Sequence, residues 1–181
     1  MNDGIRHTDI RLAASGDREA FSRLIRDSQL ELYKMARSML RQDEDVADAI
    51  QETILKAYRH ITRLREPAYF RTWLFRILIR ECMAASRRKR RFAAFLANMP
   101  KAPAIARAAG DMDLHDAVDR LGEPARTIVK LHYFADQPIA EIAAVLNISE
   151  GTVKSKLYRA RKKLAKTLTE PEEGGVGYEL H

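Results

Sequence analysis

The chain has 181 residues, of which 46% are hydrophobic and 31% are charged, a balance typical of a globular protein with one domain or two small ones. Its single cysteine, Cys82, excludes an intramolecular disulfide and a thiolate zinc site, and its five histidines are widely separated, so we expect no metal and no cofactor. The net charge of +7 predicts a polyanionic partner, nucleic acid before an anionic membrane surface.

The N-terminal segment predicts neither a signal peptide nor a membrane anchor. Residues 1–12 carry Asp3 and Asp9 and contain no apolar stretch. No apolar run along the chain approaches the roughly 18 residues that would span a bilayer. We therefore expect a soluble protein in a reducing compartment, without direct membrane insertion.

Helical periodicity with almost no strand signals predicts an all-α fold. Apolar residues recur at spacings of three and four over residues 20–39, a second helix is expected over 43–61, and a third over 69–88, after a break at Pro67. Residues 8–91 are expected to form one compact helical unit.

Composition changes over residues 92–112, where Ala is frequent and Pro100, Pro103 and Gly110 interrupt any long helix. This segment is predicted to be a flexible linker. A second helical unit is expected over residues 113–168, with a stop and a restart at Gly122 and Pro124. The remaining segment, 169–181, is rich in Glu and Gly and is predicted to be disordered.

The predicted helix over residues 45–58 has one acidic face. Val46, Ile50, Ile54 and Ala57 share the face that is expected to be buried. The opposite face and its edges carry Asp45, Asp48, Gln51, Glu52, Leu55 and Lys56. Because acidic groups on a basic protein repel DNA, this face indicates a protein partner. From these residues alone, it is equally consistent that the acidic face is an ordinary solvent-exposed surface that binds no partner.

Aromatic and cationic side chains alternate over residues 63–91. Tyr69, Phe70, Trp73 and Phe75 are interleaved with Arg71, Arg76 and Arg80, and the opposite face carries Leu74, Leu78, Cys82 and Ala85. Rings that stack on bases, beside arginines that hold phosphates, favour single-stranded nucleic acid. Phe75 and at least one of Tyr69 and Phe70 are instead expected in the core. The run RRKRR, at 87–91, is predicted to hold phosphates or to complement the helix dipole, with a nuclear-localisation cluster as the alternative.

Residues 138–168 predict a helix-turn-helix. A short amphipathic helix after Pro138 is followed by a turn at 147–149, where Ser149 is placed to cap the next helix. Val153, Leu157, Ala160, Leu164 and Leu168 fall in one narrow arc of that helix, which is expected to be buried. Seven basic residues against one acidic residue over 150–168 leave a basic outer face. This combination indicates DNA binding, and the alternative is an ordinary three-helix bundle with a solvated basic face.

Four segments, in this order, resemble the extracytoplasmic-function (ECF) sigma factors, the smallest sigma-70-type initiation factors of bacterial RNA polymerase. They are SGDREAFSRLI, DVADAIQETILKAY, YFRTWLFRILI and PIAEIAAVLNISEGTVKSKLYRARKKL. The resemblance covers roughly residues 8–168. It implies two small helical domains joined by a flexible linker, with sigma region two over 8–91 and sigma region four, the helix-turn-helix, over 113–168.

The resemblance implies that the first domain binds core RNA polymerase, at the clamp helices of the β′ subunit, and that the β subunit is also contacted. The implied residues are Asp45, Asp48, Gln51, Glu52 and Leu55. It further implies a loop that recognises and opens the −10 promoter element around a flipped base. The loop residues are Arg65, Glu66, Pro67, Ala68 and Tyr69, with Trp73, Arg76 and Arg80 beside them. At Arg80 the chain departs from many members of the family, which have Asn there.

The helix-turn-helix is implied to bind the −35 promoter element as duplex DNA. The implied residues are Thr152, Lys154, Ser155, Lys156, Arg159 and Lys162. Such factors are not enzymes, and an anti-sigma factor usually holds them inactive. The resemblance therefore implies a cytoplasmic protein that such a partner could hold at the membrane.

Two other classes of function compete with this interpretation. GTVKSKL alone also resembles the LuxR-type regulators, so a conventional helix-turn-helix regulator that binds duplex DNA as a dimer is the alternative. That class predicts a sensor or dimerising domain, whereas residues 8–91 predict a docking helix and a strand-separating face. An enzyme is disfavoured, because the chain has no glycine-rich phosphate loop and no Ser/His/Asp constellation at readable spacing.

Overall fold

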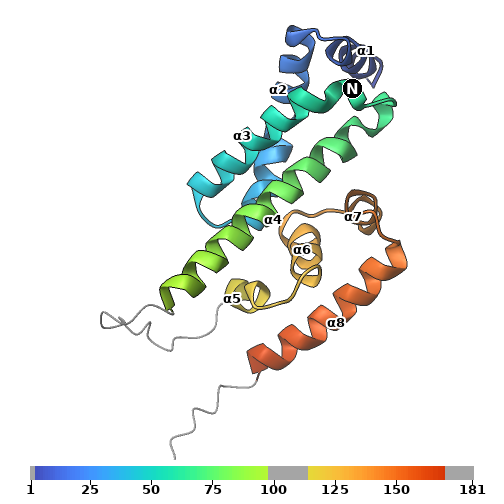
Figure 1. The fold of residues 1–181 in the computed structure, drawn as a ribbon. Helices are drawn as coiled ribbons and strands as arrows, with labels where there is room; N and C mark the ends of the chain where they lie inside the picture. Colours follow the sequence, from blue (N-terminus) through green and yellow to red (C-terminus); the bar gives the residue numbers. More distant parts are fainter. Residues whose placement is uncertain (1–2, 98–113, 170–181) are drawn as a thin grey trace, which may run out of the picture.

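The computed structural model describes residues 3–97 and 114–169, and within these two ranges every regular element is helical (Figure 1). The first unit comprises α1 (Asp3–Ala14), α2 (Arg18–Met39), α3 (Asp43–His60), the 3₁₀ turns η1 (Ile61–Arg63) and η2 (Pro67–Tyr69), and α4 (Phe70–Ala97). The second comprises α5 (Leu114–Asp119), α6 (Ala125–Val129), the π-turn η3 (Lys130–Phe134), α7 (Ile139–Leu146) and α8 (Glu150–Thr169). The predicted all-α class is confirmed.

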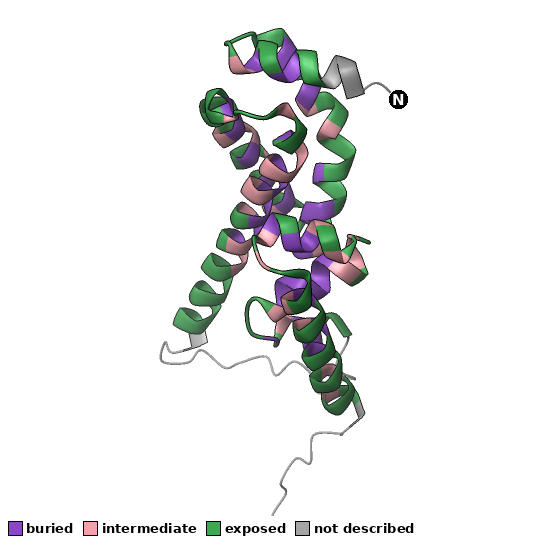
Figure 2. Ribbon diagram, turned by 90° about the vertical axis from the view of Figure 1, so that its right-hand side faces the viewer, coloured by how far each residue is buried: buried purple, intermediate pink, exposed green. Residues whose placement is uncertain are grey.

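The first unit is a bundle in which α2, α3 and α4 bury their apolar faces against one another. Asp17 caps α2, since its Oδ1 accepts a hydrogen bond from the Ala20 N–H at 3.0 Å. The face of α4 that carries Leu74, Leu78, Cys82 and Ala85 is buried, as predicted. Figure 2 shows buried residues on the inward sides of these helices and exposed residues on the outside.

Two helices of the first unit extend beyond the predicted bounds. Helix α1 begins at Asp3, before the expected start of the unit at residue 8. Helix α4 runs to Ala97, although it was expected to end near Arg88 and the linker to begin at residue 92. Residues 89–97 contain neither Gly nor Pro, so nothing in the backbone ends the helix before Pro100. The rest of the predicted linker and nearly all of the predicted tail lie outside the described residues.

The second unit is a small bundle whose short helices surround the first half of α8. The predicted stop and restart are confirmed, because α5 ends at Asp119 and α6 begins at Ala125, directly after Pro124. Its core side chains are buried at Val118, Leu121, Ile128, Val153, Leu157 and Ala160. These contacts fix the position of α8 relative to α7.

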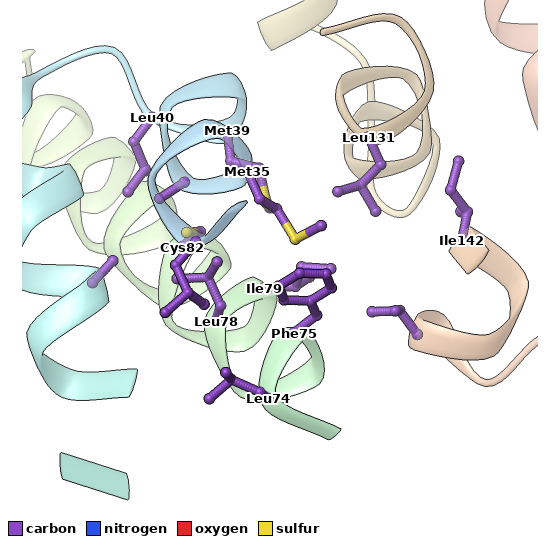
Figure 3. Packing of buried hydrophobic residues seen from close by; sticks show 14 of the residues in the cluster. Met35, Met39, Leu40, Leu74, Phe75, Leu78, Ile79, Cys82, Leu131 and Ile142 are labelled. Carbon is purple, nitrogen blue, oxygen red and sulfur yellow. The ribbon is translucent and has the colours of Figure 1, made fainter. Parts of the chain in front are cut away.

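The two units pack directly against each other, so that their buried side chains form one continuous apolar cluster. Helix α7 lies beside α4, and η3 lies beside the end of α2 (Figure 1). Figure 3 shows Met35 and Phe75 of the first unit facing Leu131 and Ile142 of the second. Sequence periodicity identifies each of these side chains as apolar but carries no information on their pairing, so the sequence left the relative packing of the two units open.

Candidate nucleic-acid and protein interfaces

The helix-turn-helix has the local geometry that its sequence predicts. Helix α7 ends at Leu146, and the residue that caps it, Asn147, has a left-handed φ of 56° that turns the chain. The Ser149 side chain then caps α8, because its Oγ accepts the Thr152 N–H at 3.1 Å. The left-handed Asn147 and the Ser149 cap together set the angle between α7 and α8.

The predicted buried arc of α8 is confirmed over its first half and wrong at its end. Val153, Leu157 and Ala160 are buried, and Leu164 is half-buried. Leu168 is 46% exposed, because the last turns of α8 extend past the short helices that cover its start (Figure 2). The apolar residues continue along one side of α8, but the short helices that cover this side end before Leu168.

All six residues predicted for duplex recognition lie on α8. Lys154, Ser155, Arg159 and Lys162 are exposed, and Thr152 and Lys156 are half-buried. Arg159 lies along its own helix, with its Nε donating to the Ser155 carbonyl at 3.3 Å. Lys162 Nζ lies 5.0 Å from the centre of the Tyr158 ring. One helix therefore presents a continuous basic face of the width that enters a major groove.

The residues predicted for the strand-opening loop lie at and before η2, where the chain turns into α4. Arg65, Glu66, Ala68 and Tyr69 are exposed, and Pro67 occupies the first turn of η2. Tyr69 is 65% exposed, whereas Phe70 is buried, so Phe70 supplies the core ring that was expected from this pair. Phe75 is buried as well, as predicted. The loop thus presents a tyrosine ring to solvent.

Trp73 and two of the arginines of α4 differ sharply in their surroundings. Trp73 is half-buried, with its ring 6.0 Å from that of Phe70. Arg80 is exposed. Arg76 donates from Nη2 and Nε to the carbonyl oxygen of Ala144 in α7, at 2.6 and 3.2 Å. Arg76, one of the residues predicted to contact the −10 element, is therefore hydrogen-bonded to the second unit.

Sequence reasoning grouped Arg71 with the arginines that hold phosphates, whereas the structure places it between the two units. Its Nε donates to Glu31 at 3.0 Å and its Nη1 to Glu141 of α7 at 3.2 Å, and its guanidinium lies over the Phe75 ring. Glu141 is 70 positions away in sequence, so no local pattern could have identified this pair.

The acidic face of α3 is solvent-exposed at four of its five predicted positions. Asp48, Gln51, Glu52 and Leu55 are exposed, and Asp45 is half-buried with its carboxylate 3.5 Å from Lys89 Nζ. Lys56 does not weaken the acidic character, because Glu81 of α4 pairs with it at 2.7 Å. The buried side is completed by Ala49 and Thr53, while Ile50 and Ile54 are only half-buried.

An apolar groove runs beside this acidic face, between α2 and α3. It has a volume of about 380 Å³. Its lining includes Tyr33, Val46, Ile50, Ile54 and Leu55. An acidic edge next to an apolar groove has the composition of a protein-binding surface, where apolar side chains supply affinity and charges supply orientation.

The described part of the chain contains neither a candidate metal site nor a membrane-spanning helix. No group of three His, Cys, Asp or Glu side chains there could hold a metal ion. None of the helices in that part is both long and apolar enough to cross a membrane.

Residues 24–92 match the family model for sigma-70 region 2, and residues 111–164 match that for sigma-70 region 4. The RNA polymerase sigma factor SigV of Bacillus subtilis is 30% identical over 155 residues, covering 82% of this chain and 90% of that protein. The ECF RNA polymerase sigma factor SigM of Mycobacterium tuberculosis is 36% identical over 156 residues, covering 85% and 80%. The solved structure of CnrH, a sigma factor of Cupriavidus metallidurans, in complex with the cytosolic domain of CnrY, is similar with a TM-score of 0.65 and 27% identity, covering 91% of this chain and 97% of that chain.

Proposed function

This chain belongs to the sigma-70 family, among the ECF RNA polymerase sigma factors. On that premise we propose which of its surfaces binds polymerase and which bind each promoter element. The acidic face of α3 docks on core polymerase, the η2 loop and the start of α4 recognise and open the −10 element, and α8 binds the −35 element. The observation that carries this proposal is the separation of charge: one acidic face and two basic faces lie on three different elements.

The polymerase contact is assigned to Asp45, Asp48, Gln51, Glu52 and Leu55, because these residues are exposed or half-exposed on a basic protein. Carboxylates on this face are repelled by promoter phosphates and attracted to a basic helical partner, which supports docking on the β′ clamp helices. The apolar groove beside them would add buried apolar area to this interface, which the charged side chains alone do not provide.

The −10 contact is assigned to Arg65, Glu66, Pro67, Ala68 and Tyr69 with Trp73, Arg76 and Arg80. The exposed Tyr69 ring and the half-buried Trp73 ring offer surfaces on which bases can stack, and the arginines can hold phosphates. Flipping a base costs a few kcal/mol, which contacts in the loop must offset.

The proposed domain bounds are 8–91 for region two and 113–168 for region four, with 92–112 as the linker and 169–181 as a tail. Since α4 continues to Ala97, the first residues of this linker are helical.

A polypeptide inhibitor is the proposed regulatory partner. The relative CnrH has been solved with the cytosolic domain of CnrY, which supports a second polypeptide on a sigma factor of this kind. We assign an anti-sigma factor to the α3 face and its apolar groove, where it would compete with polymerase. The protein would then act in the bacterial cytoplasm, and its inhibitor could hold it at the membrane.

The test is run-off transcription from fragmented genomic DNA with bacterial core polymerase, with and without the protein. New transcripts that start at discrete sites are expected, and their aligned upstream sequences would give both promoter elements. The variant Asp48→Arg/Glu52→Arg should lose polymerase binding while keeping its helical circular dichroism spectrum. Absence of transcripts, together with specific duplex binding by the protein alone, would instead establish a conventional helix-turn-helix regulator.

A further inference from the structure

The last turns of α4 extend beyond the rest of the first unit (Figure 1). Lys89 of α4 lies 3.5 Å from Asp45, near the start of α3, so the residues that follow Lys89 run past the point where α3 begins. Residues 91–96 are all exposed (Figure 2). The side chains at this end of α4 therefore take no part in the apolar core of the described residues.

Three large apolar side chains form one exposed group on these turns. Phe92, Phe95 and Leu96 are 61%, 62% and 51% exposed. Their spacing of three and four residues places them on the same side of the helix. Single apolar residues are ordinary on a protein surface, whereas a contiguous group of large ones is typical of a surface that a partner covers.

The basic run at residues 87–91 supplies unpaired cations beside this group. Lys89 and Arg90 are engaged within the chain, Lys89 with Asp45 and Arg90 with the Ser86 hydroxyl at 2.9 Å. Arg87 and Arg91 are exposed, and neither pairs with an acidic side chain in the part of the chain that the structure describes. Successive turns carry Arg87, Arg91 and Phe95 on one side of the helix. We define the α4 end face as the side formed by Arg87, Arg91, Phe92, Phe95 and Leu96.

The helix dipole does not account for the α4 end face. Cations at a helix C-terminus interact with the dipole within the last turn, and the last turn of α4 contains no basic residue. Compensation of the dipole would also give no reason for two phenylalanines and a leucine in solvent. A partner that is both anionic and apolar accounts for the charges and for the apolar side chains.

Nucleic acid and an anionic bilayer are the two polyanions to compare. Rings beside arginines suit single-stranded DNA, but Leu96 offers no ring on which a base can stack. Residues 87–97 also contain no Ser, Thr, Asn or Gln with which to contact bases. A bilayer surface offers phosphates to arginines and acyl chains to phenylalanine and leucine, which is the composition of helices that lie in a membrane interface. The α4 end face therefore fits a bilayer better than a nucleic acid.

We propose that the α4 end face binds the surface of an anionic phospholipid bilayer. Phe92, Phe95 and Leu96 enter the boundary between headgroups and acyl chains, while Arg87 and Arg91 contact headgroup phosphates. The contact is peripheral, and no segment of the chain crosses the bilayer in it.

This contact uses none of the residues assigned above to polymerase or promoter DNA. The −10 loop lies at the other end of α4, a helix of 28 residues and therefore about 42 Å long. The chain itself would thus supply a membrane contact, in addition to any that its inhibitor provides.

The first test measures co-sedimentation of the full chain with vesicles of phosphatidylcholine alone and of phosphatidylcholine with one third phosphatidylglycerol. The wild type should bind only the anionic vesicles. Arg87→Gln/Arg91→Gln should bind them about tenfold more weakly, because each cation near an anionic surface adds to the attraction. The control Arg161→Gln/Lys163→Gln removes the same charge from exposed sites on α8 and should bind like the wild type.

The apolar contribution is tested with the same vesicles. Phe92→Ser/Phe95→Ser should also weaken binding by about tenfold, since it removes the two rings that enter the boundary. The control Leu12→Ser/Leu30→Ser replaces two other exposed apolar side chains, on α1 and α2, and should leave binding unchanged. Because all these sites are exposed, circular dichroism should show the same helical content in every variant.

Insertion is followed separately with Phe95→Trp, compared with the wild type, whose one tryptophan is Trp73. The added emission should shift to shorter wavelength on anionic vesicles and be quenched by brominated acyl chains. Emission that does not respond to the vesicles would overturn insertion at Phe95.

Three other results would overturn the proposal. The first is a wild type that does not bind anionic vesicles. The second is an α8 control that loses as much binding as Arg87→Gln/Arg91→Gln, which would mean that net charge alone causes adsorption. The third concerns Phe92→Ser/Phe95→Ser: loss of affinity for labelled single-stranded DNA, with vesicle binding unchanged, would make the α4 end face a nucleic-acid contact. Run-off transcription is not part of these assays, so their failure leaves the proposed function standing.

Discussion

Cys82 shows how completely the first unit encloses a single side chain. It is fully buried in α4 (Figure 3), and this burial, with the neighbouring Glu81 as a smaller cause, raises the pKa of its thiol to about 12. Since the thiolate is the reactive form, the thiol should not react with Ellman's reagent at neutral pH in the folded protein. Rapid and complete reaction is expected in urea. Comparable rates in both conditions would show that the core around α4 opens readily.

Asp9 ties α1 to α2 through a charge-assisted pair. Arg23 donates to its two carboxylate oxygens at 2.6 and 3.2 Å, and these hydrogen bonds lower the pKa of Asp9 although burial opposes the shift. A carboxyl whose pKa is lowered on folding stabilises the fold above its unfolded pKa, about 3.9, and loses that effect as pH falls through its folded pKa. The free energy of unfolding should therefore be higher for the wild type than for Asp9→Asn at neutral pH. This difference in free energy should shrink as the pH falls. Urea titrations across that range would measure it, and a constant difference would contradict the assignment.

Residue-scale predictions from sequence succeeded where the cause was local. The cap at Ser149 and the burial of Phe75 follow from neighbours within one or two helical turns. The surroundings of Arg76 do not, because its hydrogen-bond acceptor is 68 positions away. From sequence, an arginine on the exposed side of a predicted helix is expected to be free. Only the tertiary fold shows that a carbonyl from another helix accepts its hydrogen bonds.

At the scale of elements, the capped start of α8 makes a direct contribution to stability. In Ser149→Ala the Thr152 N–H loses its acceptor, so the free energy of unfolding should fall by about 1 kcal/mol. Ser149→Asp keeps an acceptor at the same place and should be close to the wild type. Urea unfolding followed by circular dichroism distinguishes the two. An equal loss in both variants would mean that the hydroxyl acts in some other way.

On the outer face of α8, some residues should determine which DNA sequence is bound, and others should raise the affinity for any DNA sequence. Arg159 is exposed at mid-helix, where it can reach base edges, and Arg159→Ala should cost about 1–3 kcal/mol on the preferred −35 sequence and less on others. Lys162→Ala should weaken binding to all sequences alike and reduce the salt slope by about one unit. Binding assays on duplexes from the run-off alignment test both. If the two variants weaken every duplex equally, Arg159 does not contact bases.

Helix ends were harder to predict than helices. The stop at Asp119 was predictable because Gly122 and Pro124 follow it, whereas α4 passes Arg88 because the next breaker is Pro100. Composition that suggests a linker is thus compatible with helix when Ala dominates it. The exposed end of α8 shows the converse, since periodicity continues where its packing partner has ended.

At the scale of the whole molecule, Lys130 couples the two units and gives the last prediction. It is a largely buried cation whose ammonium contacts Asp119 of its own unit and the Met39 carbonyl of the other. Amphipathic patterning marks each unit separately, so this coupling could be learned only from the fold. Met at this position keeps the apolar stem but leaves the Met39 carbonyl and Asp119 without their donor, which costs about 1–3 kcal/mol for a buried group.

The sole tryptophan, Trp73, lies on α4, so its fluorescence follows the unfolding of the first unit and of its contact with α7, while far-ultraviolet circular dichroism follows the helices of both units. In the wild type the two signals should change together in urea, because packed units unfold cooperatively. In Lys130→Met the transitions should separate, with a lower midpoint for the less stable unit. Lys163→Met, at an exposed site on α8, is the matched control and should keep them superimposed. Coincident transitions with an unchanged midpoint in Lys130→Met would mean that Lys130 does not contribute to joining the units.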